Sequence, residues 1–248
     1  MALSLLDAND KLGQHAPSWY AATANPLDEF ASAKGNLKFD VTIIGGGFSG
    51  VSAALHLSEL GYKVCVLEAH RIGWGASGRN GGQVGSGQRI GPDELESLVG
   101  KSLAKQAFDL GVEACDTVRD LIEKHEIDCS YKPGTIEANH RQKYDRELQE
   151  FVELLNEEYD YNSVSYLQPE ELGEKIGSPD YSGGMLDTRT GHLHPLNYIR
   201  GLCTAAENAG ATFYEMSRVT KVQGGPPCTV TTEEAEITSD HVILAANG

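Results

Sequence analysis

A glycine-rich turn between a strand-like run and a helical run constrains this chain more than any other feature. Residues 39–44 are mostly apolar and β-branched, and they lead into Gly45-Gly46-Gly47-Phe48-Ser49-Gly50. Apolar residues at helical spacing follow, and a second strand-like run at 63–67 ends in Glu68. A strand, glycine turn, helix, strand and acid within about 30 residues predict a βαβ unit that binds a dinucleotide.

The residue types at this turn have physical reasons. Gly45 permits the tight turn, Gly47 lets the backbone approach a pyrophosphate, and Gly50 lets the helix pack close to the sheet. The helix N-terminus offers free N–H groups and a partial positive charge, which suit a diphosphate. Glu68 lies where a carboxylate accepts hydrogen bonds from ribose hydroxyls and repels a 2′-phosphate. The pattern favours FAD or NAD over NADP, whereas a glycine loop that only connects strand and helix leaves Glu68 unexplained.

A long glycine-rich segment, residues 71–87, follows the βαβ unit. It is too long and too rich in glycine for an ordinary connection, and it suggests backbone packed around a flat or extended molecule. The alternative is a flexible surface loop, but Trp74, Arg79 and Asn80 interrupt the glycines, and flexible linkers are more uniformly Gly and Ser.

Composition narrows the class of protein. The 248 residues suffice for one large domain or two small ones, and the formal charge of −16 argues against nucleic acid or an anionic membrane as a partner, although solubility explains the acidity equally well. Five scattered cysteines predict reduced thiols in a cytoplasmic protein rather than disulfides or a zinc site. No apolar run reaches the roughly 18 residues of a membrane span, and the first ten residues do not resemble a signal peptide.

The sequence predicts three regions. Residues 1–38 are expected to form an irregular arm that Trp19 and Tyr20 anchor to the body of the protein. Residues 85–195 are interpreted as an inserted, largely helical cap region, with helices at 92–99, 101–125, 141–158 and 169–176, a turn at Pro133-Gly134 and a strand at 135–138. Residues 39–84 and 196–248 are expected to form an incomplete Rossmann-like domain.

The last part of the chain predicts one helix and four strands. The helix is expected at 195–208, and the strands at 211–215, 219–223, 228–232 and 240–246. His192 and His194 precede the helix, but no Cys, Asp or Glu pattern completes a metal site, so a structural or substrate-side turn is favoured and no metal is predicted. A parallel strand that ends in Asn247-Gly248 normally leads into a turn that continues, which predicts truncation.

Four stretches together carry a resemblance to a known family. They are the arm motif 17–24, the turn 45–50, the run Gly75-Ala76-Ser77-Gly78-Arg79-Asn80-Gly81-Gly82-Gln83 and the segment 184–196. With these residues the chain resembles the FAD-dependent amine oxidoreductases of the D-amino-acid oxidase superfamily, and within it the γ-glutamylputrescine oxidase type. The resemblance implies an α/β fold with a Rossmann-like FAD-binding domain of the glutathione-reductase type.

The resemblance also implies a cofactor site. Phe48 and Ser49 would lie by the pyrophosphate, Glu68 would bind the adenosine ribose, and the backbone of Val219, as the first residue of a strand, would meet adenine. No Cys or His stands where some relatives attach flavin covalently, so FAD would be held non-covalently. The full set of expected cofactor-binding residues is Gly45, Gly47, Phe48, Ser49, Gly50, Glu68, Ala69, Ala76, Ser77, Asn80, Gly81, Gly82, Gln83, Val219 and Ala246.

The implied reaction belongs to putrescine catabolism in the cytoplasm: oxidation of a small amine to an aldehyde, with release of ammonia and hydrogen peroxide. Molecular oxygen or an electron carrier would accept the electrons. Alternatives are a glycine- or sarcosine-type amino-acid oxidase or dehydrogenase, and a non-catalytic nucleotide-binding fragment. An NAD-linked dehydrogenase gives no reason for the glycine run after Glu68. Catalytic residues are expected beyond Gly248 and none is named, and the sequence gives no oligomeric state.

Overall fold

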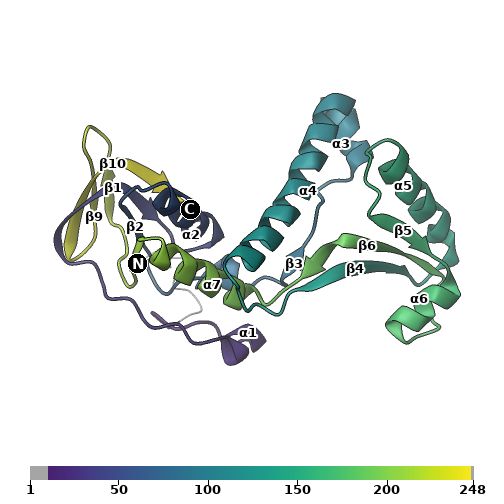
Figure 1. Cartoon of the computed structure of the whole chain (residues 1–248), viewed down its shortest axis with the longest axis horizontal. Helices are drawn as coiled ribbons and strands as arrows, with labels where there is room; N and C mark the ends of the chain where they lie inside the picture. The colour runs from purple at the N-terminus through teal and green to yellow at the C-terminus, as the bar shows by residue number, and fades with distance from the viewer. Residues whose placement is uncertain (1–10, 247–248) are drawn as a thin grey trace, which may run out of the picture. The chain divides into compact units, whose positions relative to one another are not determined.

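The structure is a computed structural model that describes residues 11–246 (Figure 1). Within that range the chain forms two compact units. Unit 1 contains the described residues up to Gly81, Leu121–Cys129 and the residues from His194 onward. Unit 2 contains Gly82–Asp120 and Ser130–Leu193.

Unit 1 is built on a six-stranded sheet. Four strands are parallel and two at one edge are antiparallel, because β9 pairs antiparallel with both β10 and β8. In spatial order the strands are β7 (Thr212–Tyr214), β2 (Val64–Leu67), β1 (Gly35–Ile44), β10 (Ala235–Leu244), β9 (Cys228–Thr231) and β8 (Lys221–Gln223).

The central pair of unit 1 joins strands about 200 residues apart in sequence. β1 and β10 pair in parallel from Gly35 opposite Ala235 to Ile44 opposite Leu244. The beginning of β1 therefore lies inside the predicted irregular arm, and the prediction that residues 35–38 are irregular was wrong. Asn36 and Lys38 carry little local strand signal, and the distant partner β10 supplies the backbone hydrogen bonds that hold this end of the strand.

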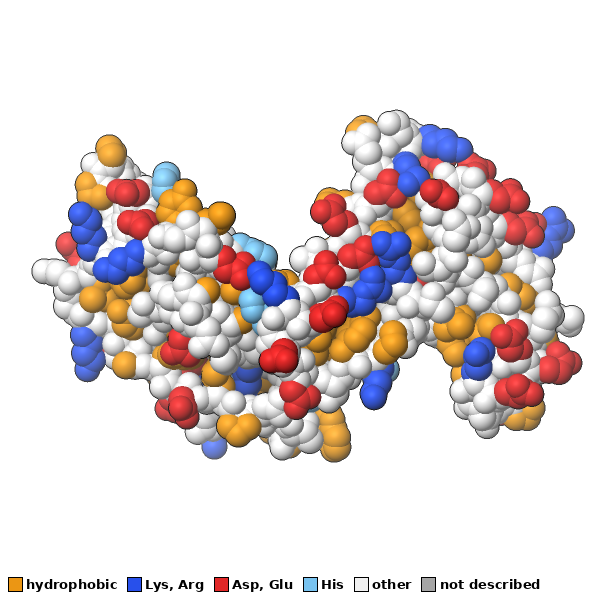
Figure 2. All heavy atoms as spheres, in the orientation of Figure 1, with side chains coloured by type: hydrophobic (Ala, Val, Ile, Leu, Met, Phe, Trp, Pro, Cys, Tyr) orange, Lys and Arg blue, Asp and Glu red, His pale blue; other side chains and the backbone are white. Residues whose placement is uncertain are grey.

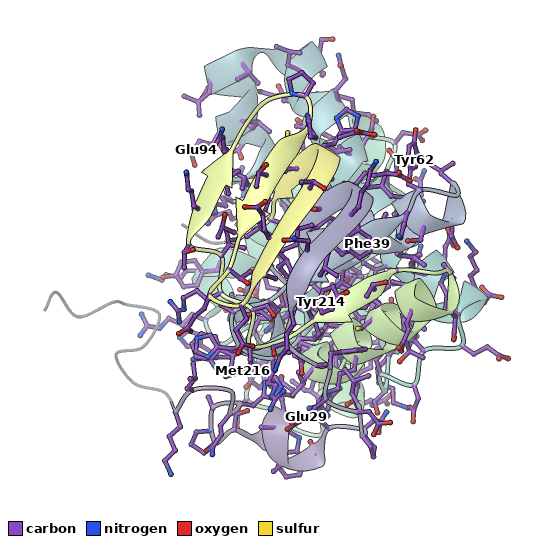
Figure 3. All side chains as sticks on the ribbon, turned by 90° about the vertical axis from the view of Figure 1, so that its left-hand side faces the viewer. Glu29, Phe39, Tyr62, Glu94, Tyr214 and Met216 are labelled. Atoms are coloured by element: carbon purple, nitrogen blue, oxygen red, sulfur yellow. The ribbon has the colours of Figure 1, made fainter. Side chains whose placement is uncertain are left out.

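Two helices, α2 (Phe48–Glu59) and α7 (Pro195–Asn208), pack together on one face of the unit 1 sheet (Figure 1). On the other face, Phe39 of β1 and Tyr214 of β7, both labelled in Figure 3, pack edge to face with ring centroids 6.4 Å apart. Cys65, Leu67 and Ile237 complete this second core. The sheet is thus buried on both faces, as parallel sheets require.

The arm contains a short helix, α1 (Trp19–Thr23), whose first turn is capped by the Ser18 hydroxyl. Tyr20 stacks edge to face on His194 with centroids 5.0 Å apart, and the Asn25 N–H donates to the Asn197 side chain at 2.7 Å. Trp19 is 75% exposed, so the prediction that it anchors the arm was wrong. Tyr20 does anchor the arm as predicted, through its ring contact with His194, and the hydrogen bond from Asn25 to Asn197 of α7 adds to it.

Unit 2 combines helices with an antiparallel sheet. β6 (Gly183–His192) pairs with β4 (Lys132–Asn139), and β5 (Val164–Leu167) and β3 (Gln83–Val84) pair with β6 at different points along it. The helices are α3 (Pro92–Val99), α4 (Lys101–Lys124, with its last turn in unit 1), α5 (Asp145–Glu157) and α6 (Pro169–Ile176). Short 3-10 turns lie at Ala76–Gly78 (η1) in unit 1 and Gln142–Tyr144 (η2) in unit 2.

The sheet of unit 2 corrects three sequence predictions. β5 and β6 were missed in a region expected to be largely helical. The predicted turn at Pro133-Gly134 lies inside β4, at a point where the register with β6 shifts. The helix predicted from 141 begins as η2, and α5 starts at Asp145. Glycines and a proline weakened the local strand signal here, and pairing between distant segments overrode it.

Acidic and basic side chains are interspersed over the face shown in Figure 2, so the negative charge forms no single continuous patch there. Among the described residues, no helix has the combination of length and apolar character that crossing a membrane requires.

Candidate nucleotide-binding site

The glycine turn after β1 packs against backbone atoms rather than against side chains. Gly45 has φ +111°, a conformation that side chains rarely adopt, and a Cβ there would lie 2.7 Å from the Ala245 oxygen. The Gly45 N–H donates to the Leu67 oxygen at 2.9 Å, which ties the turn to the end of β2. Glycine is therefore required at the first position of the turn.

Gly50 permits the closest backbone approach at this turn. A Cβ on Gly50 would lie 1.9 Å from the Gly45 oxygen and 3.3 Å from the Ala245 Cβ. The first turn of α2 consequently rests directly on the turn that precedes it, which brings the helix N-terminus to the carboxyl ends of β1 and β10. This is the edge of a parallel sheet at which ligands bind.

The N-terminus of α2 has no side-chain cap from its N-cap residue, Gly47. The Phe48 N–H instead donates to the Ser77 hydroxyl at 2.9 Å, and a Cβ on Gly47 would come within 3.0 Å of the same oxygen. Ser49 is exposed. Four of the predicted residues, Gly47, Phe48, Ser49 and Ser77, are therefore together at one helix N-terminus.

Glu68 follows β2 and points back at the glycine turn. Its Oε2 accepts from the Gly46 N–H at 2.7 Å, and its Oε1 accepts from the His70 N–H at 2.8 Å. Burial raises the pKa of Glu68, the two N–H groups act in the opposite direction, and nearby Glu215 adds to the rise. A carboxylate oxygen accepts about two hydrogen bonds, so each oxygen of Glu68 keeps capacity for a hydroxyl donor.

The glycine-rich segment folds over this turn. The Gly73 N–H donates to the Gly46 backbone oxygen at 2.9 Å. The Asn80 side chain donates to the backbone carbonyl oxygens of Ala76 and Ser77 at 3.1 Å each. These bonds hold Ala76, Ser77 and Asn80 in one compact turn in unit 1, with Gly81 directly after it. Ala69 lies between Glu68 and the buried His70.

Two predicted residues belong to the other unit. Gly82 has φ +75° and its oxygen accepts from the Leu193 N–H at 2.9 Å, and Gln83 begins β3 with an exposed side chain. The predicted set is thus distributed between the two units.

The last two predicted residues, Val219 and Ala246, follow β7 and β10 in the chain. The Ser217 N–H donates to the backbone carbonyl oxygen of Glu68 at 2.8 Å, so the segment leading to Val219 runs beside the end of β2. Val219 is not the first residue of a strand as predicted, because β8 begins at Lys221. Ala246 is exposed and follows β10, after Ala245, whose N–H donates to the Ile44 oxygen at 2.9 Å.

Sequence reasoning missed a buried ion pair beside the site. Glu215 is 3% exposed and accepts from Arg71 at 2.8 Å, from the Ile72 N–H at 2.7 Å and from the Phe30 N–H at 3.1 Å. It follows Tyr214, which pairs with Leu67, so Glu215 and Glu68 occupy matching positions after neighbouring parallel strands. An acid directly after a second strand-like run was the available signal.

The two predicted histidines have separate roles. His194 caps α7 by accepting from the Asn197 N–H through Nδ1 at 3.1 Å, whereas His192 is the last residue of β6 in unit 2. Within residues 11–246, no three His, Cys, Asp or Glu side chains gather in a way that would hold a metal ion.

The donor set of unit 1 fits a dinucleotide. The turn has no side chain at Gly45, Gly47 or Gly50, the helix N-terminus supplies backbone N–H groups, and a partly buried carboxylate with remaining acceptor capacity lies at the end of the next strand. These groups suit a diphosphate and a ribose with two free hydroxyls.

Comparison with known proteins agrees with this geometry. Residues 40–248 match the family profile described as FAD dependent oxidoreductase (DAO). The chain is 38% identical over 232 residues to a probable oxidoreductase OrdL of Rhizobium meliloti, which covers 93% of this chain and 54% of that protein. It is 37% identical over 234 residues to the γ-glutamylputrescine oxidoreductase of Escherichia coli, which covers 94% of this chain and 55% of that protein. The chain spans about half the length of these curated relatives.

Solved structures show the same fold. A glycine oxidase from Geobacillus kaustophilus superposes with a TM-score of 0.69 at 21% identity, covering 85% of this chain and 55% of that one. An L-amino acid deaminase from Proteus myxofaciens superposes with a TM-score of 0.72 at 24% identity, covering 90% and 48%.

Proposed function

Because this chain belongs to the DAO family of FAD-dependent oxidoreductases, we propose that it is the nucleotide-binding part of an enzyme that oxidises a small amine of the γ-glutamylputrescine kind. The observation that carries the substrate class is the 37% identity to the γ-glutamylputrescine oxidoreductase over 94% of this chain. The proposed products are an aldehyde, ammonia and hydrogen peroxide, formed with water and with molecular oxygen as the electron acceptor.

FAD, when bound, supplies the two-electron acceptor that amine oxidation needs. We assign its diphosphate to the N-terminus of α2, where Gly47 leaves room and Phe48 and Ser49 offer N–H groups. The Ser77 hydroxyl now accepts from the Phe48 N–H, so it would share that position with a phosphate oxygen.

The remaining proposed contacts follow from position. Glu68 would accept from the ribose hydroxyls, for which its two oxygens keep capacity. Val219 would meet adenine through its backbone. Ala69, Ala76, Asn80, Gly81 and Ala246 would border the cofactor in unit 1, and Gly82 and Gln83 of unit 2 would approach the isoalloxazine.

Two other functions have some support. The glycine oxidase and the L-amino acid deaminase share the fold, which keeps an amino-acid oxidase or dehydrogenase as the second candidate. The third, a nucleotide-binding fragment without activity of its own, is supported by the chain's spanning about half of its relatives.

The test begins with cofactor retention. FAD is added to the purified chain, excess is removed by desalting, and the visible spectrum is recorded before and after heat denaturation. Flavin bands that remain on the protein and are released by heat support a non-covalent site. A colourless wild-type protein contradicts the proposal that this chain holds FAD, and a Glu68→Gln variant that retains FAD as tightly as wild type contradicts the role of Glu68.

The substrate class is tested on the FAD-loaded chain. Anaerobic bleaching of the flavin bands by γ-glutamylputrescine, but not by glycine or sarcosine, supports the amine assignment. Bleaching by the amino acids instead replaces it with the second candidate. A loaded chain that none of these compounds bleaches supports the fragment. Peroxide formation on admitting air separates an oxidase from a dehydrogenase.

A further inference from the structure

Unit 1 contains a polar cavity of about 280 Å³ that shares no residue with the assigned cofactor contacts. Its walls are one side of α7, the segment 125–128 that follows α4, and Asn25 and Pro26 of the arm. All of these residues belong to unit 1. Pockets for drug-sized ligands begin at about 300 Å³, so this cavity suits a molecule of a few non-hydrogen atoms.

The cavity lacks hydrogen-bond acceptors for its buried nitrogens. Within residues 11–246, four buried polar side-chain atoms have no hydrogen-bond partner, and two of them, Arg200 Nε and His125 Nε2, belong to residues that line this cavity. The nearest acidic oxygen to His125 Nε2, Glu59 Oε1, is 3.7 Å away and therefore too far for a hydrogen bond. Buried polar atoms in native proteins nearly always have partners, so these two nitrogens indicate an acceptor that the chain itself does not supply.

Arg200 offers one complete edge of its guanidinium. Its Nη1 donates to the backbone oxygen of Asn25. Its Nε has no acceptor, and no hydrogen bond among the described residues uses its Nη2. Nε–H and Nη2–H lie parallel on one side of the planar group, at the spacing of the two oxygens of a carboxylate. The open edge therefore suits bidentate binding of a carboxylate.

The charge of Arg200 is not neutralised by an ion pair within the described part of the chain. Burial lowers the pKa of Arg200, and Glu215 acts in the opposite direction, although that carboxylate already forms an ion pair with Arg71. Buried charges are normally paired or hydrogen-bonded. The unpaired N–H and the adjoining cavity, rather than the missing counter-ion alone, indicate an anionic ligand.

Asn197 supplies a second donor from the same face of α7, three residues before Arg200. Its side chain lines the cavity and is 6% exposed. The Asn25 N–H donates to its Oδ1 at 2.7 Å, which fixes the orientation of the amide. Its Nδ2 forms no hydrogen bond with the described residues, so it is a neutral donor beside the charged one.

The remaining walls select among anions. Glu126 and Asp128 line the cavity and are exposed, so they repel a doubly charged anion more strongly than a singly charged one. Pro26, Ile127 and Ala205 add apolar surface. Together these walls favour a single carboxylate on a short apolar chain over inorganic phosphate.

We propose that this cavity of unit 1 binds a small monocarboxylate, with its two oxygens on Nε and Nη2 of Arg200 and with Asn197 Nδ2 as a further donor. The monocarboxylate is a ligand of this cavity and is not the compound that is oxidised. The proposal does not rest on the proposed function, because neither flavin nor any assigned flavin contact takes part in it.

The test is a nuclear magnetic resonance titration of the flavin-free chain at neutral pH, read at the Nε–H signal of Arg200. The Arg200→Lys variant identifies this signal by its loss. Propionate should shift the signal and saturate the shift, propanamide of the same shape but without charge should leave it in place, and phosphate should bind about threefold more weakly than propionate or worse.

Three outcomes contradict the proposal. No shift with propionate overturns the site, and an equal shift with propanamide overturns its selection for an anion. Phosphate that binds as tightly as propionate overturns the assignment to a monocarboxylate. The readout at Arg200 is independent of flavin retention, so failure here and failure of the proposed function are distinguishable.

Variants of the two donors locate the site. Asn197→Asp keeps the acceptor for the Asn25 N–H but replaces the Nδ2 donor by a negative oxygen, and should weaken propionate binding by about tenfold. Arg200→Lys keeps the charge but loses the parallel N–H groups, and should weaken it by a similar factor, measured at the Asn197 side-chain amide signal. Unchanged affinity in both variants, with the circular dichroism spectrum of wild type, overturns the site.

Two further variants test the electrostatic part. Asp128→Asn removes an exposed charge at the cavity but keeps the backbone oxygen to which Asn25 donates, and should tighten propionate binding by about twofold. Arg146→Gln is the matched control, because Arg146 is exposed, pairs with Glu150 and lies in unit 2, and it should leave the affinity unchanged. Equal changes in these two variants would show that only the net charge of the protein matters, which contradicts a local site.

Discussion

Gly50 in unit 1 and Gly87 in unit 2 are the same residue type in opposite surroundings. A Cβ on Gly50 would lie 1.9 Å from the Gly45 oxygen, whereas a Cβ on Gly87 would have nothing within 4 Å. At Gly50, glycine lets two backbone segments touch. At Gly87, the backbone is exposed and has open space beside it. The comparison shows that a glycine-rich sequence marks either close approach or open space, and only the neighbours distinguish the two.

The buried carboxylates divide in a similar way. Glu215 forms an ion pair with Arg71 and accepts from two backbone N–H groups, so its negative charge is neutralised inside the protein. Glu68 and Asp187 are held by neutral donors only. Glu68 lies in the site proposed here for the cofactor. Asp145 is likewise 8% exposed and accepts only from the Asn139 amide and the Ser182 hydroxyl, so the lack of a cation does not by itself mark a binding group in this molecule.

The largest effect is expected from Gly50→Ala. The added Cβ cannot be placed without moving the turn from the helix, and we expect a loss of stability of about 3 kcal/mol or more. Urea unfolding of the variant measures it. Gly75→Ala is the matched control, since a Cβ there meets nothing within 4 Å, and it should change the midpoint little. Equal urea midpoints for Gly50→Ala and Gly75→Ala would contradict the difference drawn here between glycines at a close backbone approach and glycines in open space.

The second largest loss of stability is expected from Glu215→Gln. The substitution keeps a hydrogen-bond acceptor for the Ile72 N–H but removes the buried charge opposite Arg71, which should cost about 2 kcal/mol. Glu234→Gln is the control, because its pair with Lys34 at 3.5 Å is exposed and should contribute less than about 1 kcal/mol. Thermal unfolding at neutral pH measures both, and a smaller loss in Glu215→Gln than in Glu234→Gln would contradict the structural role of Glu215.

Glu68 should make stability depend on pH. Its folded pKa is raised above the ordinary 4.5, so its favourable contribution is complete below 4.5 and is lost as pH rises through the folded pKa. Relative to wild type, Glu68→Gln should therefore gain stability with rising pH in that window, at a slope of at most about 1.4 kcal/mol per pH unit. Denaturant midpoints across the window measure it. A difference that falls with pH would show that the folded pKa is lowered.

The smallest effect is expected from Gly87→Ala. Its Cβ enters open space and the unfolded chain loses freedom, so stability should stay within about 0.5 kcal/mol of wild type or rise slightly. Urea unfolding measures the change. A loss comparable to that of Gly50→Ala would contradict the open surroundings of Gly87.

The βαβ unit was predictable because its signals are local. The strand from Phe39 onward, the glycine turn, α2, β2 and Glu68 lie within 30 successive residues, 39–68, and the residue types there favour the backbone conformations that they adopt. The bounds of α3 and α7 also followed from local signals, since proline stands at the first turn of each. Local signals were less accurate for Val219, which lies two residues before β8, the strand that it was predicted to begin.

The sheet of unit 2 could not be predicted in the same way. β6 contains Gly183, Gly184 and Gly191 and pairs with segments that are as much as about 100 residues distant, so no local pattern identifies it. The surroundings of Asp187 were equally hidden. Tyr161, whose hydroxyl donates to Asp187, lies 26 residues earlier in the chain, and only packing brings the two together.

By itself, the sequence determined the glycine turn, the acid after β2, the long glycine-rich segment and the resemblance to a family, because these depend on residue types at short spacing. The tertiary structure alone decided the pairing of β1 with β10, the burial of Glu215 against Arg71 and the surroundings of Asp187. The physical reason is that pairing, burial and charge neutralisation depend on which distant segments meet, and a one-dimensional pattern does not record those contacts.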